Sequence, residues 1–156
     1  MPAWFDLDAL PVTLRTPDDE AGYVSASRSI HAMIDAEIAK GTPASHIFLG
    51  GFSQGGALAL FSGLSYREAL GGVISFSGWL PLWDSKLKQS PTLASSKLLI
   101  VHGDEDDKVL FECGERSRDV LTPKVKSLAF KTATFGHSMH PSQPGWLHEF
   151  ILESLK

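Results

Sequence analysis

Short apolar runs recur along the chain at three places. Residues 47–52, 72–76 and 98–101 consist almost wholly of apolar residues and glycine, and glycine or polar residues bound each run. Runs of this length and character are typical of strands that are buried on both faces of a parallel sheet. A fourth segment, 125–135, alternates apolar and polar residues in "VKSLAFKTATF", which predicts a further strand.

Between these runs, apolar side chains recur at helical spacing. In the segment that opens with "TPDDEAG", isoleucines stand four residues apart from 30 to 38, and Gly41 closes the pattern. Thr16 is predicted to cap this helix and Pro17 to take its first position. Further helices are expected from about residue 54, over 109–121 and over 144–156. Strands that alternate with helices in this way predict an α/β fold built on a parallel sheet.

Composition narrows the class of protein. The chain has 156 residues, of which 43% are hydrophobic and 21% charged, as expected of one globular domain over 1–156. Its net charge of −4 gives no electrostatic reason to expect nucleic acid or an anionic membrane as a partner. The single cysteine, Cys113, cannot form an internal disulfide. Because the sequence also shows no signal peptide and no apolar span long enough to cross a bilayer, we expect a cytoplasmic protein without a transmembrane segment.

Glycine residues crowd around Ser53, where residues 51–55 fit the pattern G-x-S-x-G. A predicted strand precedes this pattern and a predicted helix follows it, which is the context of a sharp turn that lifts a serine hydroxyl above the sheet. Close packing at such a turn is expected to require glycine at both 51 and 55. The helix that follows aims free N–H groups above the serine, and that of Gln54 is the natural first oxyanion donor. We interpret Ser53 as a nucleophile; the alternative is a glycine-rich helix start without chemistry.

A nucleophilic serine needs a base, and the base needs a group that orients it. Acidic residues follow the strand 98–101, and His137 follows the strand 125–135. The carboxyl ends of parallel strands meet at one edge of the sheet, and the order serine, acid, histidine is that of an α/β-hydrolase triad. His140 is an alternative base only three residues from His137, and His102 is expected to make a local contact in the turn beneath the site.

The same region also allows a metal interpretation. Its candidate ligands are Asp104, Glu105, Asp106, His137 and His140. The sequence contains no HExxH motif and no Cys/His ligand spacing that would support it. We therefore expect neither a metal ion nor a cofactor.

Five segments of the chain resemble the acyl-protein thioesterases, which belong to the lysophospholipase and carboxylesterase group of α/β-hydrolases. In order, they are "PAWFDLDAL", "GGFSQGGALAL", "SGWLPL", "HGDEDDKV" and "GHS", and the resemblance runs from Pro2 almost to the C-terminus. It implies a mostly parallel sheet flanked by helices, with Ser53 as nucleophile, Asp106 as triad carboxylate and His137 as base. It further implies an oxyanion N–H at Gln54 and a loop bordering an acyl channel, formed by Trp79, Leu80 and Pro81.

The resemblance also implies a function. It indicates a serine hydrolase that cleaves acyl thioesters or carboxylic esters through an acyl-enzyme, with S-acylated proteins or lysophospholipids as substrates. Members of the family ordinarily begin well upstream of "PAWFD", with two or three more strands and an early His-Gly loop that gives a second oxyanion N–H. We therefore expect a domain that is incomplete at its N-terminus. A catalytically silent domain that binds acyl chains or a full-length partner is the alternative, and a homodimer is left open.

The acid loop departs from the pattern of that family at one position. Family members often have proline directly after the catalytic acid, and this chain has Asp107 there. A second carboxylate at that place is expected to compete with Asp106 for His137.

Overall fold

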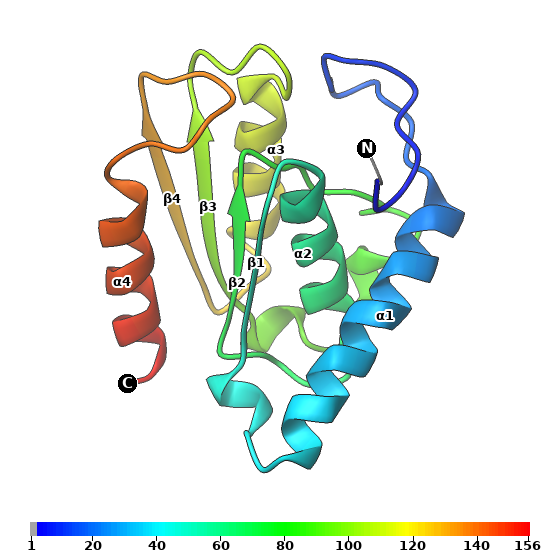
Figure 1. The fold of residues 1–156 in the computed structure, drawn as a ribbon, viewed down its shortest axis with the longest axis vertical. Coiled ribbons are helices and arrows are strands. Elements are labelled where there is room, and N and C mark those ends of the chain that lie inside the picture. The colour runs from blue at the N-terminus through cyan, green and yellow to red at the C-terminus, as the bar shows by residue number, and fades with distance from the viewer. Residues whose placement is uncertain (1–2) are drawn as a thin grey trace.

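A four-stranded parallel sheet forms the centre of the computed structural model, which describes residues 3–156 (Figure 1). Pro2, with which the family resemblance begins, lies outside the described residues. The strands stand in the order β1-β2-β3-β4 and comprise β1 Phe48–Phe52, β2 Gly72–Phe76, β3 Lys97–Gly103 and β4 Ser127–Ala133. The helices are α1 Glu20–Ala39, α2 Gln54–Ser65, α3 Phe111–Leu121 and α4 Gln143–Ser154, with single 3-10 turns η1 Ala44–His46, η2 Leu87–Gln89 and η3 Leu93–Ser95. The predicted α/β class is confirmed.

Alternate residues of the strands face two separate apolar cores. On one face, Val73 and Leu98 pack with side chains of α1, α2 and α3. On the other, Ile74 and Leu99 pack with Phe150 of α4. This period of two follows from strand geometry, because successive side chains point to opposite faces of a sheet. Helices therefore cover both faces, as a largely parallel sheet requires.

The prediction that residues 47–52 are buried on both faces is wrong. β1 pairs with β2 alone among the described residues, so it lies at the edge of the sheet. Gly50 and Phe52 are exposed, and the other three residues of the strand are only partly buried. A uniformly apolar run does not distinguish a central strand from an edge strand, since both can have the same composition.

The start of α1 also differs from the prediction. The helix begins at Glu20, and Asp19 caps it by accepting a hydrogen bond from the N–H of Gly22 at 3.0 Å, while its other carboxylate oxygen accepts the N–H of Asp6 at 2.9 Å. Thr16 does not cap the helix, because its hydroxyl accepts the N–H of Thr13. Thr16 and Asp19 are both residue types that can cap a helix, and a local pattern does not show which of them does so.

The segment between β3 and α3 is held in place by the N-terminal part of the chain. Val12 and Val109 form a parallel bridge, with the N–H of Val12 donating to the carbonyl of Lys108 at 2.8 Å and that of Leu110 donating back to Val12 at 3.0 Å. Because of this bridge, α3 begins at Phe111 rather than at Val109. None of the helices formed by residues 3–156 combines the length and apolar character that crossing a bilayer would need.

Candidate active site

Ser53 occupies a sharp turn between the end of β1 and the start of α2. Its φ of 56° lies in the left-handed region, which costs a residue other than glycine about 1–3 kcal/mol, and its N–H donates to the carbonyl of Phe76 at 2.8 Å. A Cβ at Gly51 would overlap the backbone carbonyl of Gly55, whereas a Cβ at Gly55 would meet no atom within 4 Å. The predicted need for glycine is therefore confirmed at 51 and is wrong at 55.

His137 connects Ser53 to Asp106 through two hydrogen bonds. The Nδ1 of His137 lies 2.8 Å from Oδ2 of Asp106, and its Nε2 lies 2.9 Å from Oγ of Ser53. Since an ionised carboxylate only accepts, Nδ1 carries the proton and Nε2 is left to accept the serine hydroxyl. The ring of Phe52 packs against the imidazole, with 4.8 Å between ring centroids. The three groups stand at the carboxyl ends of β1, β3 and β4.

Asp106 is buried and held by backbone donors. Its Oδ1 accepts the N–H groups of Lys108 and Val109, both at 2.9 Å, and its side chain has no exposed surface. Asp107, the residue expected to compete for His137, is exposed and lies 3.1 Å from Nζ of Lys108. The carboxylate directed at the imidazole is therefore that of Asp106.

His140 has a different place in the fold. Its ring stands 5.0 Å from that of Phe135 and 5.7 Å from that of Trp146, to which it is parallel within 6°. Its Nδ1 accepts the N–H of Ser142 at 3.2 Å. These contacts hold His140 at the start of α4, away from the hydrogen bonds that join Ser53 to Asp106. Within residues 3–156, no three His, Cys, Asp or Glu side chains are grouped closely enough to hold a metal ion.

Gln54 contributes both its backbone and its side chain to the turn. As the first residue of α2, it has an N–H for which the helix supplies no acceptor, beside the serine hydroxyl. Its side-chain amide donates to the carbonyl of Phe5 at 3.0 Å and accepts the N–H of Trp4 at 3.4 Å. These two side-chain hydrogen bonds were not predicted from the sequence, because their partners lie 49 and 50 positions earlier in the chain.

The loop after β2, which the resemblance places beside an acyl channel, is enclosed by the rest of the chain. Trp79, Leu80 and Pro81 are all buried. Trp79 and Leu80 line a cavity of about 190 Å³ together with polar side chains that include Asp18 and Arg116. Burial raises the pKa of Asp18, although the N–H of Leu82 donates to its carboxylate at 2.8 Å. An apolar groove of about 270 Å³ lies elsewhere, beside the serine turn, with a lining that includes Trp4, Gly51, Phe52, Gly55 and Leu58.

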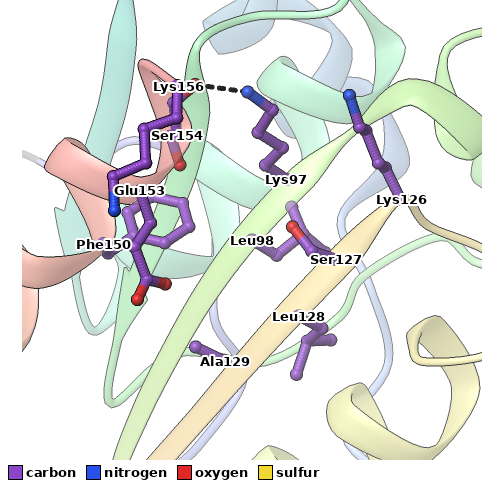
Figure 2. A pocket seen from close by; sticks show the side chains of 10 residues that line it. All are labelled: Lys97, Leu98, Lys126, Ser127, Leu128, Ala129, Phe150, Glu153, Ser154 and Lys156. Atoms are coloured by element: carbon purple, nitrogen blue, oxygen red, sulfur yellow. Dashed lines mark hydrogen bonds between the residues drawn. The ribbon is translucent and has the colours of Figure 1, made fainter.

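A larger groove, of about 470 Å³, lies at the opposite end of the sheet, where β3 and β4 begin and α4 ends (Figure 2). Lys97 donates there to the carbonyl of Ser154, and Lys126 and Lys156 also line the groove. The lining includes Leu98, Leu128 and Phe150 but no histidine. It therefore offers cations and apolar surface without the nucleophile and base that the other edge combines.

Comparison with known proteins identifies the family. Residues 1–155 match the phospholipase/carboxylesterase family. The chain belongs to this family. A probable carboxylesterase of Oryza sativa subsp. japonica is 42% identical over 158 residues, which cover 100% of this chain and 59% of that protein. Acyl-protein thioesterase 1 of Neurospora crassa is 35% identical over 162 residues, with 99% of this chain and 66% of that protein covered.

A solved structure of the family has the same fold. The crystal structure of Arabidopsis thaliana SOBER1 superimposes with a TM-score of 0.89 at 36% identity, covering 99% of this chain and 74% of that one. The family resemblance and the α/β-hydrolase fold predicted from the sequence are thereby confirmed. The chain spans roughly three fifths to two thirds of the length of the curated relatives from rice and Neurospora.

Proposed function

We propose that this chain of the phospholipase/carboxylesterase family acts as a serine hydrolase on carboxylic esters and acyl thioesters, with Ser53, His137 and Asp106 as its catalytic triad. The observation that carries the proposal is the unbroken series of hydrogen bonds from Ser53 through His137 to Asp106. The names of two relatives, a probable carboxylesterase and an acyl-protein thioesterase, give further support.

In the proposed reaction, Oγ of Ser53 attacks the acyl carbonyl carbon while its proton passes to Nε2 of His137. Asp106 keeps the imidazole in the required tautomer and stabilises the imidazolium that forms. The intermediate collapses as His137 returns the proton to the departing alcohol or thiol, which leaves Ser53 acylated. Water then attacks the acyl-enzyme carbonyl carbon while His137 accepts its proton. The bond from that carbon to Oγ breaks, Oγ of Ser53 takes the proton back from His137, and the carboxylic acid is released.

The charge on the tetrahedral intermediate requires donors at the serine turn. We assign one of them to the backbone N–H of Gln54, whose position at the start of α2 points it at the space above Ser53. A donor of this kind typically contributes about a hundredfold to a thousandfold in rate. Two hydrogen bonds support the role by fixing Gln54 in place: its side-chain amide donates to the carbonyl of Phe5 and accepts the N–H of Trp4.

For the substrate, we propose S-acylated proteins or lysophospholipids in the cytoplasm. The relative from Neurospora crassa is named an acyl-protein thioesterase, and the matching family is named for phospholipases and carboxylesterases. We also propose that the apolar loop of Trp79, Leu80 and Pro81 borders the acyl group. In support, the Trp79 ring packs edge-on at 6.0 Å against Phe5, whose carbonyl accepts the Gln54 amide.

The proposal predicts a single covalent adduct at Ser53. The chain is treated with a fluorophosphonate and its intact mass is measured, beside Ser53→Ala and the control Ser29→Ala, which alters an exposed serine of α1. We expect one adduct on the parent chain and the control and none on Ser53→Ala. Hydrolysis of a p-nitrophenyl ester should fall by about 10⁴-fold or more in the same variant.

Two outcomes would count against the triad. An adduct that persists on Ser53→Ala would place the reactive serine elsewhere. A folded parent chain that takes no adduct and hydrolyses no ester would favour a binding domain without turnover.

A further inference from the structure

His102, in β3, is a polar side chain in the apolar interior. It is fully buried, and its Nε2 lies 2.8 Å from the carbonyl of Val109. A carbonyl only accepts, so Nε2 carries the proton and donates. The same atom lies 3.5 Å from Oδ2 of Asp106, too far for a strong hydrogen bond, so the histidine reaches the carboxylate through Val109.

Val109 links this imidazole to Asp106. Through its carbonyl it accepts the His102 donor, and through its N–H it donates to Oδ1 of Asp106 at 2.9 Å. The peptide units on both sides of Val109 are therefore fixed, one by the histidine and the other by the carboxylate. The remaining carboxylate oxygen is then available to His137 at 2.8 Å.

The interior accommodates this histidine at a cost. Its Nδ1 has no hydrogen-bond partner among the described residues, and an unpartnered buried polar atom is unfavourable. Its ring also lies so close to α3 that a Cβ at Gly114 would overlap it. The neighbouring β3 residues Ile100 and Val101 are apolar, so an apolar side chain would suit the packing at 102 without that cost.

We propose that His102 is a positioning residue for Asp106. By holding the carbonyl of Val109, it sets the turn of residues 106–109 so that the carboxylate faces His137 in the orientation the base requires. The inference rests on the proposed triad and adds a residue that touches neither the substrate nor the reacting atoms. It assigns a function to a buried polar group that packing alone does not explain.

The experiment compares substitutions that keep or remove the donor. His102→Gln retains an amide N–H that reaches about as far as Nε2, while His102→Leu has apolar bulk and no donor. His148→Gln, at an exposed position of α4, is the matched control. We expect kcat for a p-nitrophenyl ester to fall by tenfold to about a hundredfold in His102→Leu with KM little changed, and to stay within a few-fold of the parent chain in His102→Gln.

A second readout does not depend on turnover. In protein with ¹⁵N-labelled histidine, the far-downfield Nδ1–H resonance of His137, assigned with His137→Gln, reports its hydrogen bond to Asp106. We expect this resonance in the parent chain and in His102→Gln, and its loss or upfield shift in His102→Leu. If His102→Leu does not fold, His102→Asn replaces it, because that amide is too short to reach Val109.

The outcomes separate the two proposals. Unchanged kcat and an unchanged His137 resonance in the donor-free variant would overturn the positioning role. So would a loss in His102→Gln as large as that in His102→Leu. A parent chain that hydrolyses no ester would defeat the proposed function, while a resonance lost only without the donor would still support the positioning of Asp106.

Discussion

At the scale of single residues, backbone strain in the chain gathers where the strands end. Ser53 and Ser77, two of the three non-glycine residues with positive φ in the described part of the chain, directly follow β1 and β2, with φ of 56° and 50°. Their N–H groups donate to Phe76 and Val101, each on the neighbouring strand. Hydrogen bonds across the sheet thus hold both residues in an unfavourable conformation, and at Ser53 the hydroxyl lies within 2.9 Å of Nε2 of His137.

The two glycines that flank Ser53 are predicted to respond differently to alanine. Gly51→Ala is expected to destabilise the fold and to slow fluorophosphonate labelling, because its Cβ would overlap the carbonyl of Gly55. Gly55→Ala places its methyl group in open space within α2, where alanine is favoured over glycine by up to about 1 kcal/mol. Urea unfolding and labelling rates of both variants test this. If Gly51→Ala keeps the unfolding free energy and the labelling rate of Gly55→Ala, the turn does not need glycine at 51.

Cys113 is predicted to be unreactive while the chain is folded. Its side chain is 4% exposed in α3, and burial raises the pKa of the thiol to about 11. At pH 8 the thiolate that attacks alkylating reagents is therefore scarce, and the sulfur is covered. We expect iodoacetamide to modify Cys113 only under unfolding conditions, as followed by intact mass. Stoichiometric modification of folded protein within minutes would contradict this environment.

At the scale of elements, α1 is tied to the N-terminal segment through one carboxylate. Asp19 caps the helix through one oxygen and holds the N–H of Asp6 through the other. Those two backbone donors lower the pKa of Asp19. The stabilisation is therefore present above the ordinary value near 3.8 and is lost as pH falls through the lower value in the folded chain.

Two substitutions of Asp19 are predicted to lower the melting temperature by different amounts. Asp19→Ala removes both acceptors and should lower Tm at pH 7 the most. Asp19→Asn keeps one acceptor oxygen and should fall between Ala and the parent chain. Differential scanning calorimetry at pH 7 and at pH 3 measures both. The differences should narrow at pH 3, because below 3.8 the unfolded parent chain binds a proton that the folded carboxylate, with its lowered pKa, binds less readily. Equal Tm values for the three proteins at pH 7 would exclude the cap.

At the scale of the whole molecule, the sequence predicted what local pattern determines. Four strands, four helices and their parallel arrangement followed from apolar periodicity, and the positions of Ser53 and His137 followed from short motifs. One sheet joins these elements, which supports the single domain that we propose for 1–156. The edge position of β1, the cap at Asp19 and the Gln54 contacts depend on residues far apart in sequence, so no local pattern could reveal them.

Global stability is predicted to fall between pH 7 and pH 5 because of His102. Burial lowers its pKa below the ordinary 6.5, against the opposing effects of the Val109 carbonyl and Asp106. Below pH 6.5, His102 of the unfolded chain therefore binds a proton more readily than the buried His102 of the folded chain does. The free energy of unfolding should then decrease with falling pH, by at most about 1.4 kcal/mol per pH unit for one such group.

The His102→Gln variant isolates this contribution, because it removes the titrating group and keeps a donor. Urea unfolding at pH 7.5, 6.5 and 5.5 should show a shallower loss of stability in His102→Gln than in the parent chain. The exposed His148→Gln control should retain the parent slope. Parallel slopes for His102→Gln and the parent would mean that His102 takes up its proton equally well in the folded chain. In that case, the neutral donor tautomer that links Val109 to Asp106 would not persist below neutral pH.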